Sequence, residues 1–243
     1  MYSLYIKEIK VFLHSVIGYI VMGVFLSLTG LFLWFFPMSY NILDRGYADL
    51  GSFFAMAPIV FLLLIPAITM RSFAEEKRVG TMELLLTMPL SNWQIVLAKY
   101  FAAITLLFIA LLPTLIYVVS VNALGYPKGN LDMGATWGSY LGLLFLGASF
   151  AAIGQFASLI TDSQIVSFIV AVLLCFVVWL GFDFIYSFNI FGSLGLIIKS
   201  LGIDHHYSSI SRGVIDTRDV VYFLSVIVLF LEFSHLKLQS RKW

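Results

Sequence analysis

Five long stretches of the chain contain no charged residue, and this feature limits the possible folds more than any other. A helix that spans a membrane needs about 20 consecutive, mostly apolar residues. The five stretches have about this length. A shorter apolar stretch near the C-terminus reaches it if Glu232 lies at an aqueous end. We therefore predict six spans, at residues 16–36, 52–70, 100–121, 137–160, 164–186 and 219–236.

The composition agrees with a membrane protein and argues against other classes. Of the 243 residues, 61% are hydrophobic and 11% are charged, whereas a soluble domain carries about 25% charged residues. The net charge of +1 provides no basic excess to neutralise the phosphates of a nucleic acid. The one cysteine, Cys175, cannot form a disulfide within the chain. The predicted fold is an all-α polytopic membrane protein whose residues 1–243 form a single transmembrane domain.

The distribution of lysine and arginine predicts the orientation of the six spans. Cytoplasmic connections of membrane proteins carry an excess of these residues. A cytoplasmic N-terminus places nine of them inside and five outside, so we expect both termini in the cytoplasm. The inner set is Lys7, Lys10, Arg71, Lys77, Arg78, Lys99, Lys237, Arg241 and Lys242, and the outer set is Arg45, Lys128, Lys199, Arg212 and Arg218.

Residues 1–15 predict an amphipathic helix that lies in the membrane interface before the first span. At helical spacing, Tyr5, Ile9 and Phe12 share one face, and Lys7 and Lys10 fall on another. Such a helix buries its apolar face at the boundary between headgroups and acyl chains.

Residues 187–217 are apolar but interrupted, and they predict a re-entrant outer element. Gly192 and Gly195 weaken the first part, which is too short to span. Asp204 is expected to cap the second of two short helices, and Gly213 lies in the turn that follows. We therefore expect this element to enter and leave the membrane on the same side.

Three of the predicted spans begin at or near capping signals. Thr161 with Gln164, and Ser91 with Gln94, match the capping box, in which a hydroxyl residue is followed three positions later by Glu or Gln. Asp216 offers a carboxylate at the start of the last span. The two boxes predict that the helices of the fifth and third spans begin directly after short connections.

The connection between the second and third spans concentrates charge. It reads RSFAEEKRVGTMELLLTMPLSNWQ from Arg71, and we predict a cytoplasmic helix over residues 71–90. Arg71, Glu75 and Arg78 form a stripe of alternating sign, and Glu76 and Glu83 belong to a second polar line.

The same connection also carries apolar residues and a break. Met82, Leu85 and Leu86 form an apolar patch. Gly80 interrupts the helix, and Thr81 is expected to cap the second piece. The residues alone leave two interpretations open: a helix lying in the membrane interface, or a surface with apolar anchors and a charged rim that docks on another protein.

Two segments resemble the ABC-2 type transporter permeases. Residues 71–100 match the pattern E-x-x-x-GT-x-E-LLL-x-x-P-[LIV]-S, and the segment from Ser209, SISRGVIDTRDVVYFLSVIVLFLEFSHLKLQSRKW, is similar to the last extracellular segment and final span of that family. Within the family, the opening LYIKEIKVFLHSVIGYIV resembles the permease subunit of the gliding-motility ABC transporter. The run NILDRGYADLGSFFAMAPIVFLLLIPAITMRSFAEEK is also similar to that subunit.

The resemblance implies a function and a set of partners. The chain would be the permease of an ATP-driven exporter with no cofactor of its own, because a separate ATPase chain in two copies would bind ATP and Mg²⁺. A second permease copy or a related subunit would complete the pathway in a bacterial inner membrane. The gliding type implies an auxiliary subunit with a large extracytoplasmic domain. The coupling helix would then contain Glu75, Glu76, Lys77, Arg78, Gly80, Thr81, Met82, Glu83, Leu85 and Leu86.

Other functions fit the residues less well. The P-loop pattern G-x-x-x-x-G-K-[ST] is missing from the sequence, so we do not expect ATP hydrolysis by this chain. Ser149 and His235 are expected at different depths, whereas a nucleophile and its base must meet within about 3 Å. Adjacent His205 and His206 would not point to one metal site on a helix. A membrane scaffold that recruits an ATPase without transporting a substrate is the alternative function.

Overall fold

The computed structural model describes residues 1–127, 129–188 and 195–240, and all regular secondary structure in these residues is helical. Six of the helices, counted through their kinks, are long and apolar enough to cross a membrane, as predicted. They are Val16–Trp34, Gly51–Val79, Asn92–Leu124, Met133–Ile160, Gln164–Ser187 and Thr217–Gln239.

The individual helices divide these six segments further. The first part of the chain forms α1 (Tyr2–Leu13), α2 (Val16–Trp34), α3 (Ile42–Arg45), α4 (Gly51–Thr69), α5 (Ala74–Val79), α6 (Met82–Thr87), α7 (Asn92–Leu111), the 3-10 turn η1 (Leu112–Thr114) and α8 (Leu115–Leu124). The second part forms α9 (Met133–Ile160), α10 (Gln164–Phe176), the π-helical turn η2 (Val177–Gly181), α11 (Phe182–Ser187), α12 (Gly195–Ser200), α13 (Ile203–Ile210) and α14 (Thr217–Gln239).

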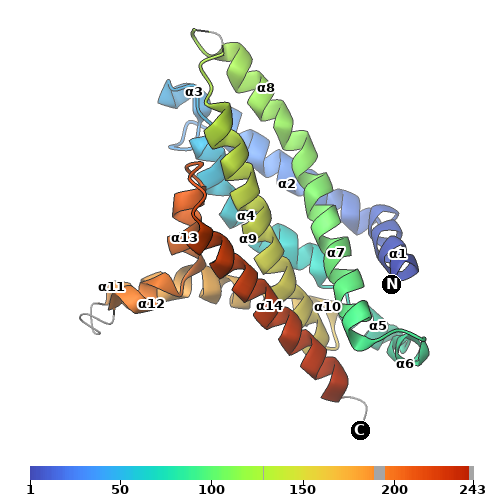
Figure 1. The fold of residues 1–243 in the computed structure, drawn as a ribbon. Coiled ribbons are helices and arrows are strands. Elements are labelled where there is room, and N and C mark those ends of the chain that lie inside the picture. Colours follow the sequence, from blue (N-terminus) through green and yellow to red (C-terminus); the bar gives the residue numbers. More distant parts are fainter. Residues whose placement is uncertain (128, 189–194, 241–243) are drawn as a thin grey trace.

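Helix α9 forms the centre of the bundle and packs against α4, α7, α10 and α14 (Figure 1). Its small residues make this close packing possible. A Cβ atom at Gly154 would lie 2.2 Å from the Thr69 hydroxyl, and one at Gly147 would lie 2.3 Å from Leu107. These small residues therefore allow neighbouring helices to approach α9 closely, and Ser149 of α9 donates to the carbonyl of Phe145 in the same helix.

Two groups of short elements gather at the two ends of this bundle. Figure 1 places α5 and α6 near α1 and the C-terminal half of α14, so the first and last helices reach that end. The short helix α3 and the tip of α8 lie at the opposite end (Figure 1). Helix α3 was not predicted; the side chain of Asn41 caps it by accepting from the backbone N–H groups of Leu43 and Asp44.

The capping predictions have mixed outcomes. Ser91 and Gln94 form the expected capping box at the start of α7, and Asp216 caps α14 by accepting from the N–H of Arg218. The box at Thr161 and Gln164 is wrong, because the Thr161 hydroxyl donates to Ala157 in the last turn of α9 and α10 begins only at Gln164. The preceding helix thus uses the hydroxyl that the following helix was expected to use.

Candidate functional site

The predicted charged connection folds as two short helices with a glycine between them. Helix α5 ends at Gly80, whose φ of +78° lies in the left-handed region that glycine adopts without steric cost. Helix α6 then begins after Thr81. The expected side-chain cap from Thr81 is wrong, because its hydroxyl contacts the Glu76 carbonyl instead.

The start of α5 is fastened to the end of α9. The Ser158 hydroxyl accepts from the backbone N–H groups of Phe73 and Ala74 at 2.9 and 3.0 Å. It also donates to the Met70 carbonyl at 3.1 Å. Ser158 is fully buried, and through these bonds it satisfies backbone groups that the first turn of a helix leaves open. A side chain distant in sequence therefore sets the position of α5.

Lys77 continues this attachment on the next face of α5. Its ammonium group donates to the carbonyls of Leu159 and Thr161 and lies 3.3 Å from the Asp162 carboxylate. The Lys77 side chain is only 4% exposed. It therefore binds the C-terminal carbonyls of α9, where a positive charge is favourable, and it contributes little to the outer surface of α5.

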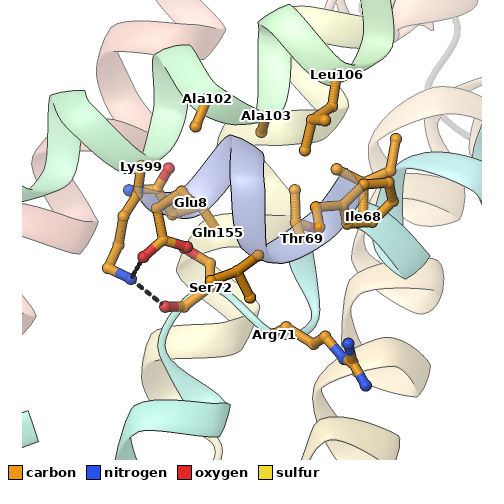
Figure 2. Close-up of a pocket in the computed structure, with 12 residues that line it drawn as sticks. Glu8, Ile68, Thr69, Arg71, Ser72, Lys99, Ala102, Ala103, Leu106 and Gln155 are labelled. Atoms are coloured by element: carbon orange, nitrogen blue, oxygen red, sulfur yellow. Dashed lines mark hydrogen bonds and ion pairs between the residues drawn. The ribbon is translucent and has the colours of Figure 1, made fainter. Parts of the chain in front are cut away.

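Glu76 also points inward, into a charged cluster with Lys7, Glu8 and Lys99. Lys99 of α7 lies 2.8 Å from Glu8 of α1 and 3.2 Å from Glu76 of α5, and Lys7 lies 3.2 Å from Glu76. The Lys99 ammonium also donates to the carbonyl of Ser72 (Figure 2). Lys99 is 3% exposed and Glu76 is 7% exposed, so the centre of this cluster joins three helices beneath the surface, while the Lys7 side chain is 55% exposed.

A small cavity of about 40 Å³ lies beside this cluster (Figure 2). Gln155 of α9 lines it and donates to the Val96 carbonyl, while its own carbonyl oxygen is buried without a hydrogen-bond partner among the described residues. The Ser72 hydroxyl is also buried and without such a partner. The volume and the two open polar atoms suit a bound water molecule.

The apolar residues of α6 divide between the interior and the surface. Met82 and Leu85 are buried in a cluster with Ile95, Leu159 and Leu238, and Leu86 is half-buried against it. These residues, predicted as one patch, therefore attach α6 to the bundle. A docking partner could reach other apolar side chains. Leu84 is 65% exposed, Val79 61% and Met88 43%.

Charged side chains surround the exposed apolar residues of α5 and α6. Glu83 and Arg78 are exposed, and Arg78 forms an ion pair of 2.8 Å with Glu75. We call Glu75, Arg78, Val79, Glu83, Leu84 and Met88 the α5–α6 face. An apolar centre with a mixed-charge rim is typical of a helix that binds in a groove of another protein.

Sequence reasoning did not find the structural roles of Glu8, Lys99, Ser158 and Gln155. For Lys99, Ser158 and Gln155 the signal was a polar residue at the edge of, or within, an otherwise apolar span, where a polar side chain needs a partner. Glu8 lies in the amphipathic N-terminal helix and carried no such signal. Which partners they find depends on the packing of α1, α7 and α9.

The other predicted element, residues 187–217, contains α12 and α13. Gly195 is the first residue of α12, and Gly192 lies outside the described residues. Asp204 does not cap α13, because Gly202 holds the capping position and the Asp204 carboxylate accepts from the indole of Trp179 at 3.1 Å. Burial, and then the charge of nearby Asp183, raise the pKa of Asp204, whereas the Trp179 bond acts in the opposite direction.

The residues considered for other chemistry have separate partners. His235 stacks on Trp93 with ring centroids 4.7 Å apart, and Ser149 is bonded within α9. His206 contacts Asp219 of α14. The structure therefore does not assemble the serine–histidine pair that we considered.

Comparison with known protein families gives one match over most of the chain. Residues 37–233 match the model of a family described as ABC-2 family transporter protein. A search of curated proteins gave no significant match. The matched range includes α4 to α13 and most of α14, and with them the α5–α6 face.

Proposed function

Because the chain belongs to the ABC-2 transporter family and is a multi-pass membrane protein, we propose that it is the permease subunit of an ATP-driven ABC transporter. Members of this family are membrane subunits that lack an ATPase site of their own. A separate ATPase, in two copies that bind ATP and Mg²⁺, would supply the energy. A second permease copy, or a related subunit, would complete the pathway.

The α5–α6 face carries this proposal, because it has the surface chemistry of a docking site and is rigidly attached. Val79, Leu84 and Met88 are exposed, with Arg78 and Glu83 beside them. Ser158 and Lys77 fasten the same segment to α9. A displacement of this face would therefore be transmitted to α9, the central helix of the bundle, as a rigid-body switch requires. Closure of the two ATPase copies onto each other when they bind ATP would cause such a displacement.

The narrower proposal is a transporter of the gliding-motility type. It rests on the resemblance of the sequence LYIKEIKVFLHSVIGYIV to that subfamily. This sequence covers most of the N-terminal helix and the start of the first span. An auxiliary subunit with a large extracytoplasmic domain would then belong to the complex. Purification of the native complex, followed by identification of its subunits, tests this proposal directly.

Changing the charge and the apolar character of the α5–α6 face is expected to release the ATPase. In Glu83→Lys/Leu84→Asp, one rim charge is inverted and the apolar anchor becomes charged. Removing one partner of a charge pair that is desolvated at an interface costs about 2–5 kcal/mol, because the other charge is left unpaired, so co-purification of the ATPase should fall at least about tenfold.

A matched variant at the opposite end of the molecule controls for the changes themselves. Asp44→Lys/Leu43→Asp makes the same kinds of change on α3, a carboxylate to lysine and an exposed leucine to aspartate, and Leu43 is 59% exposed. It should retain the ATPase at wild-type yield. Equal recovery of the ATPase with both variants would place the docking site elsewhere and contradict the proposal.

The orientation in an inner membrane can be tested by labelling from outside. In a Cys175→Ala background, a cysteine introduced at Asn130 should react in intact cells with a thiol reagent that cannot cross membranes. A cysteine introduced at Arg78 should react only after the membrane is opened. Both positions are exposed, so burial does not explain a difference. Labelling of Arg78→Cys in intact cells would invert the predicted topology.

A further inference from the structure

His206 of α13 lies between two oxygen atoms that act as hydrogen-bond acceptors. Its Nδ1 atom is 2.7 Å from the Asp219 carboxylate, and its Nε2 atom is 2.9 Å from the backbone carbonyl of Ser200. A neutral imidazole has one N–H and one bare nitrogen, so it can donate to just one acceptor. Both contacts are satisfied together when one further proton is present, on the ring or on the Asp219 carboxyl group.

The pair is largely buried and lies against an aromatic ring. The His206 and Asp219 side chains are only 14% and 11% exposed, so a carboxylate without a cation beside it would be costly there. The Tyr222 ring stacks on His206 with centroids 3.9 Å apart, a contact that favours a cationic imidazole. The Tyr222 hydroxyl also donates to the Leu201 carbonyl at 2.6 Å. Two residues one turn apart on α14 therefore contact the His206 ring: Asp219 at its edge and Tyr222 on its face.

The contacts connect three helices. Ser200 is the last residue of α12, His206 lies in α13, and Asp219 lies in the first turn of α14. If the pair loses its proton, a bare nitrogen faces an oxygen atom and the carboxylate keeps its charge without a cation. Both changes weaken the attachment of α12 and α13 to α14.

Other ionisable groups near His206 are engaged elsewhere or exposed. The His205 ring meets it edge-on at 5.2 Å between centroids, and His205 is exposed. Lys199 of α12 lies 3.9 Å from Asp183 of α11. Asp204, on α13 itself, accepts a hydrogen bond from the indole of Trp179. From α9, the side chain that reaches the end of α13 is Ser139, which is uncharged. Within the part of the chain that the structure describes, Asp219 is therefore the charged group in direct contact with the His206 ring.

We propose that His206 and Asp219 form a proton-binding latch that closes α12 and α13 onto α14 when protonated and opens as the pH rises. The direction follows from the bonding, because the closed arrangement contains the proton and the open arrangement does not. Stability from the latch is therefore present at lower pH and lost as the pair gives up its proton. The latch goes beyond the proposed function and does not depend on an ATPase or a substrate.

Thiol labelling of the full chain in lipid nanodiscs tests the latch. In a Cys175→Ala background, Ile203→Cys reports opening, because Ile203 is fully buried in α13. Ser208→Cys is an exposed reference in the same helix and corrects for the chemistry of the thiol. From about pH 6 to about pH 9, the labelling rate of Ile203→Cys relative to that of Ser208→Cys should rise at least about tenfold, because a bond to a charged group is lost.

Two variants should change this pH dependence in opposite ways. In Asp219→Asn, the amide can donate to Nδ1 of a neutral ring whose Nε2–H donates to Ser200, so protection should persist at high pH. In His206→Gln, the side chain cannot reach both partners, and labelling should be fast at every pH. His205→Gln and Asp216→Asn are the matched controls in the same two helices, and they should keep the wild-type dependence.

The outcomes separate the latch from a merely structural contact. A wild-type ratio that does not change with pH would overturn the proposal. A rise with pH that Asp219→Asn retains, or that His205→Gln removes, would overturn it equally. If His206→Gln does not fold, the comparison of Asp219→Asn with Asp216→Asn still decides the question.

Discussion

The variant Lys99→Met is expected to lower the free energy of unfolding by about 3 kcal/mol, the lower end of the range for a broken buried ion pair. It removes the buried cation of the cluster and leaves the buried Glu76 carboxylate with the largely exposed Lys7 as its remaining ion-pair partner. Lys99 is 3% exposed and lies within 3.2 Å of carboxylate oxygens of both Glu8 and Glu76. Methionine fills a similar volume but provides no charge and no donor. Unfolding of the purified chain in nanodiscs, induced by denaturant or heat, measures the loss.

Removing a second charge should restore much of the lost stability. In Lys99→Met/Glu76→Gln, the remaining Lys7 and Glu8 still carry opposite charges, 3.9 Å apart. Replacing a whole buried ion pair by neutral residues is often nearly neutral in free energy. A loss of stability in the double variant as large as in Lys99→Met would show that packing, and not charge, explains the effect.

The same substitution at an exposed lysine is the control. Lys199 has a side chain that is 37% exposed and lies 3.9 Å from Asp183. Exposed ion pairs are worth about 1 kcal/mol or less, so Lys199→Met should change stability by no more than that. If Lys99→Met and Lys199→Met have equal effects, the charged cluster does not hold α1, α5 and α7 together.

The six spans could be predicted from the sequence because the membrane imposes a simple rule on composition. A run without charge, such as residues 137–160, has few alternatives to a spanning helix. The break at Gly80 and the box at Ser91 could also be predicted, because both are local. These signals depend on residues within one turn of each other.

The inward and outward faces of α5 and α6 could not be predicted in the same way. Glu76 and Glu83 appeared equivalent on a helical projection, but Glu76 meets Lys7, which is 69 residues away. Met82 and Leu85 turn inward because the C-terminal end of α14 brings Leu238 beside them. Such partners are set by the packing of whole helices, which a single stretch of sequence does not contain. The proposed docking surface therefore shifts to Val79, Leu84 and Met88 within the same connection.

The second large effect is expected at Gly213, where α13 turns into α14 against the start of α9. Its φ of +84° is costly for any residue with a side chain, by about 1–2 kcal/mol. A Cβ atom there would also lie 2.3 Å from the Ala135 Cα atom and 2.7 Å from its carbonyl oxygen. Gly213→Ala should therefore lower the free energy of unfolding by about 2–5 kcal/mol, the sum of strain and overpacking.

Gly46 separates these two contributions, since it shares the conformation but not the crowding. Its φ is +68°, and, among the described residues other than its two chain neighbours, no atom lies within 4 Å of the position of a Cβ. Gly46→Ala should therefore cost only the strain of about 1–2 kcal/mol. The difference between the two alanine variants measures how tightly the turn after α13 is pressed onto α9. Because backbone atoms cause the clash, the turn can relieve it only by moving away from α9. Equal losses in the two variants would mean that this turn is free to shift away from α9.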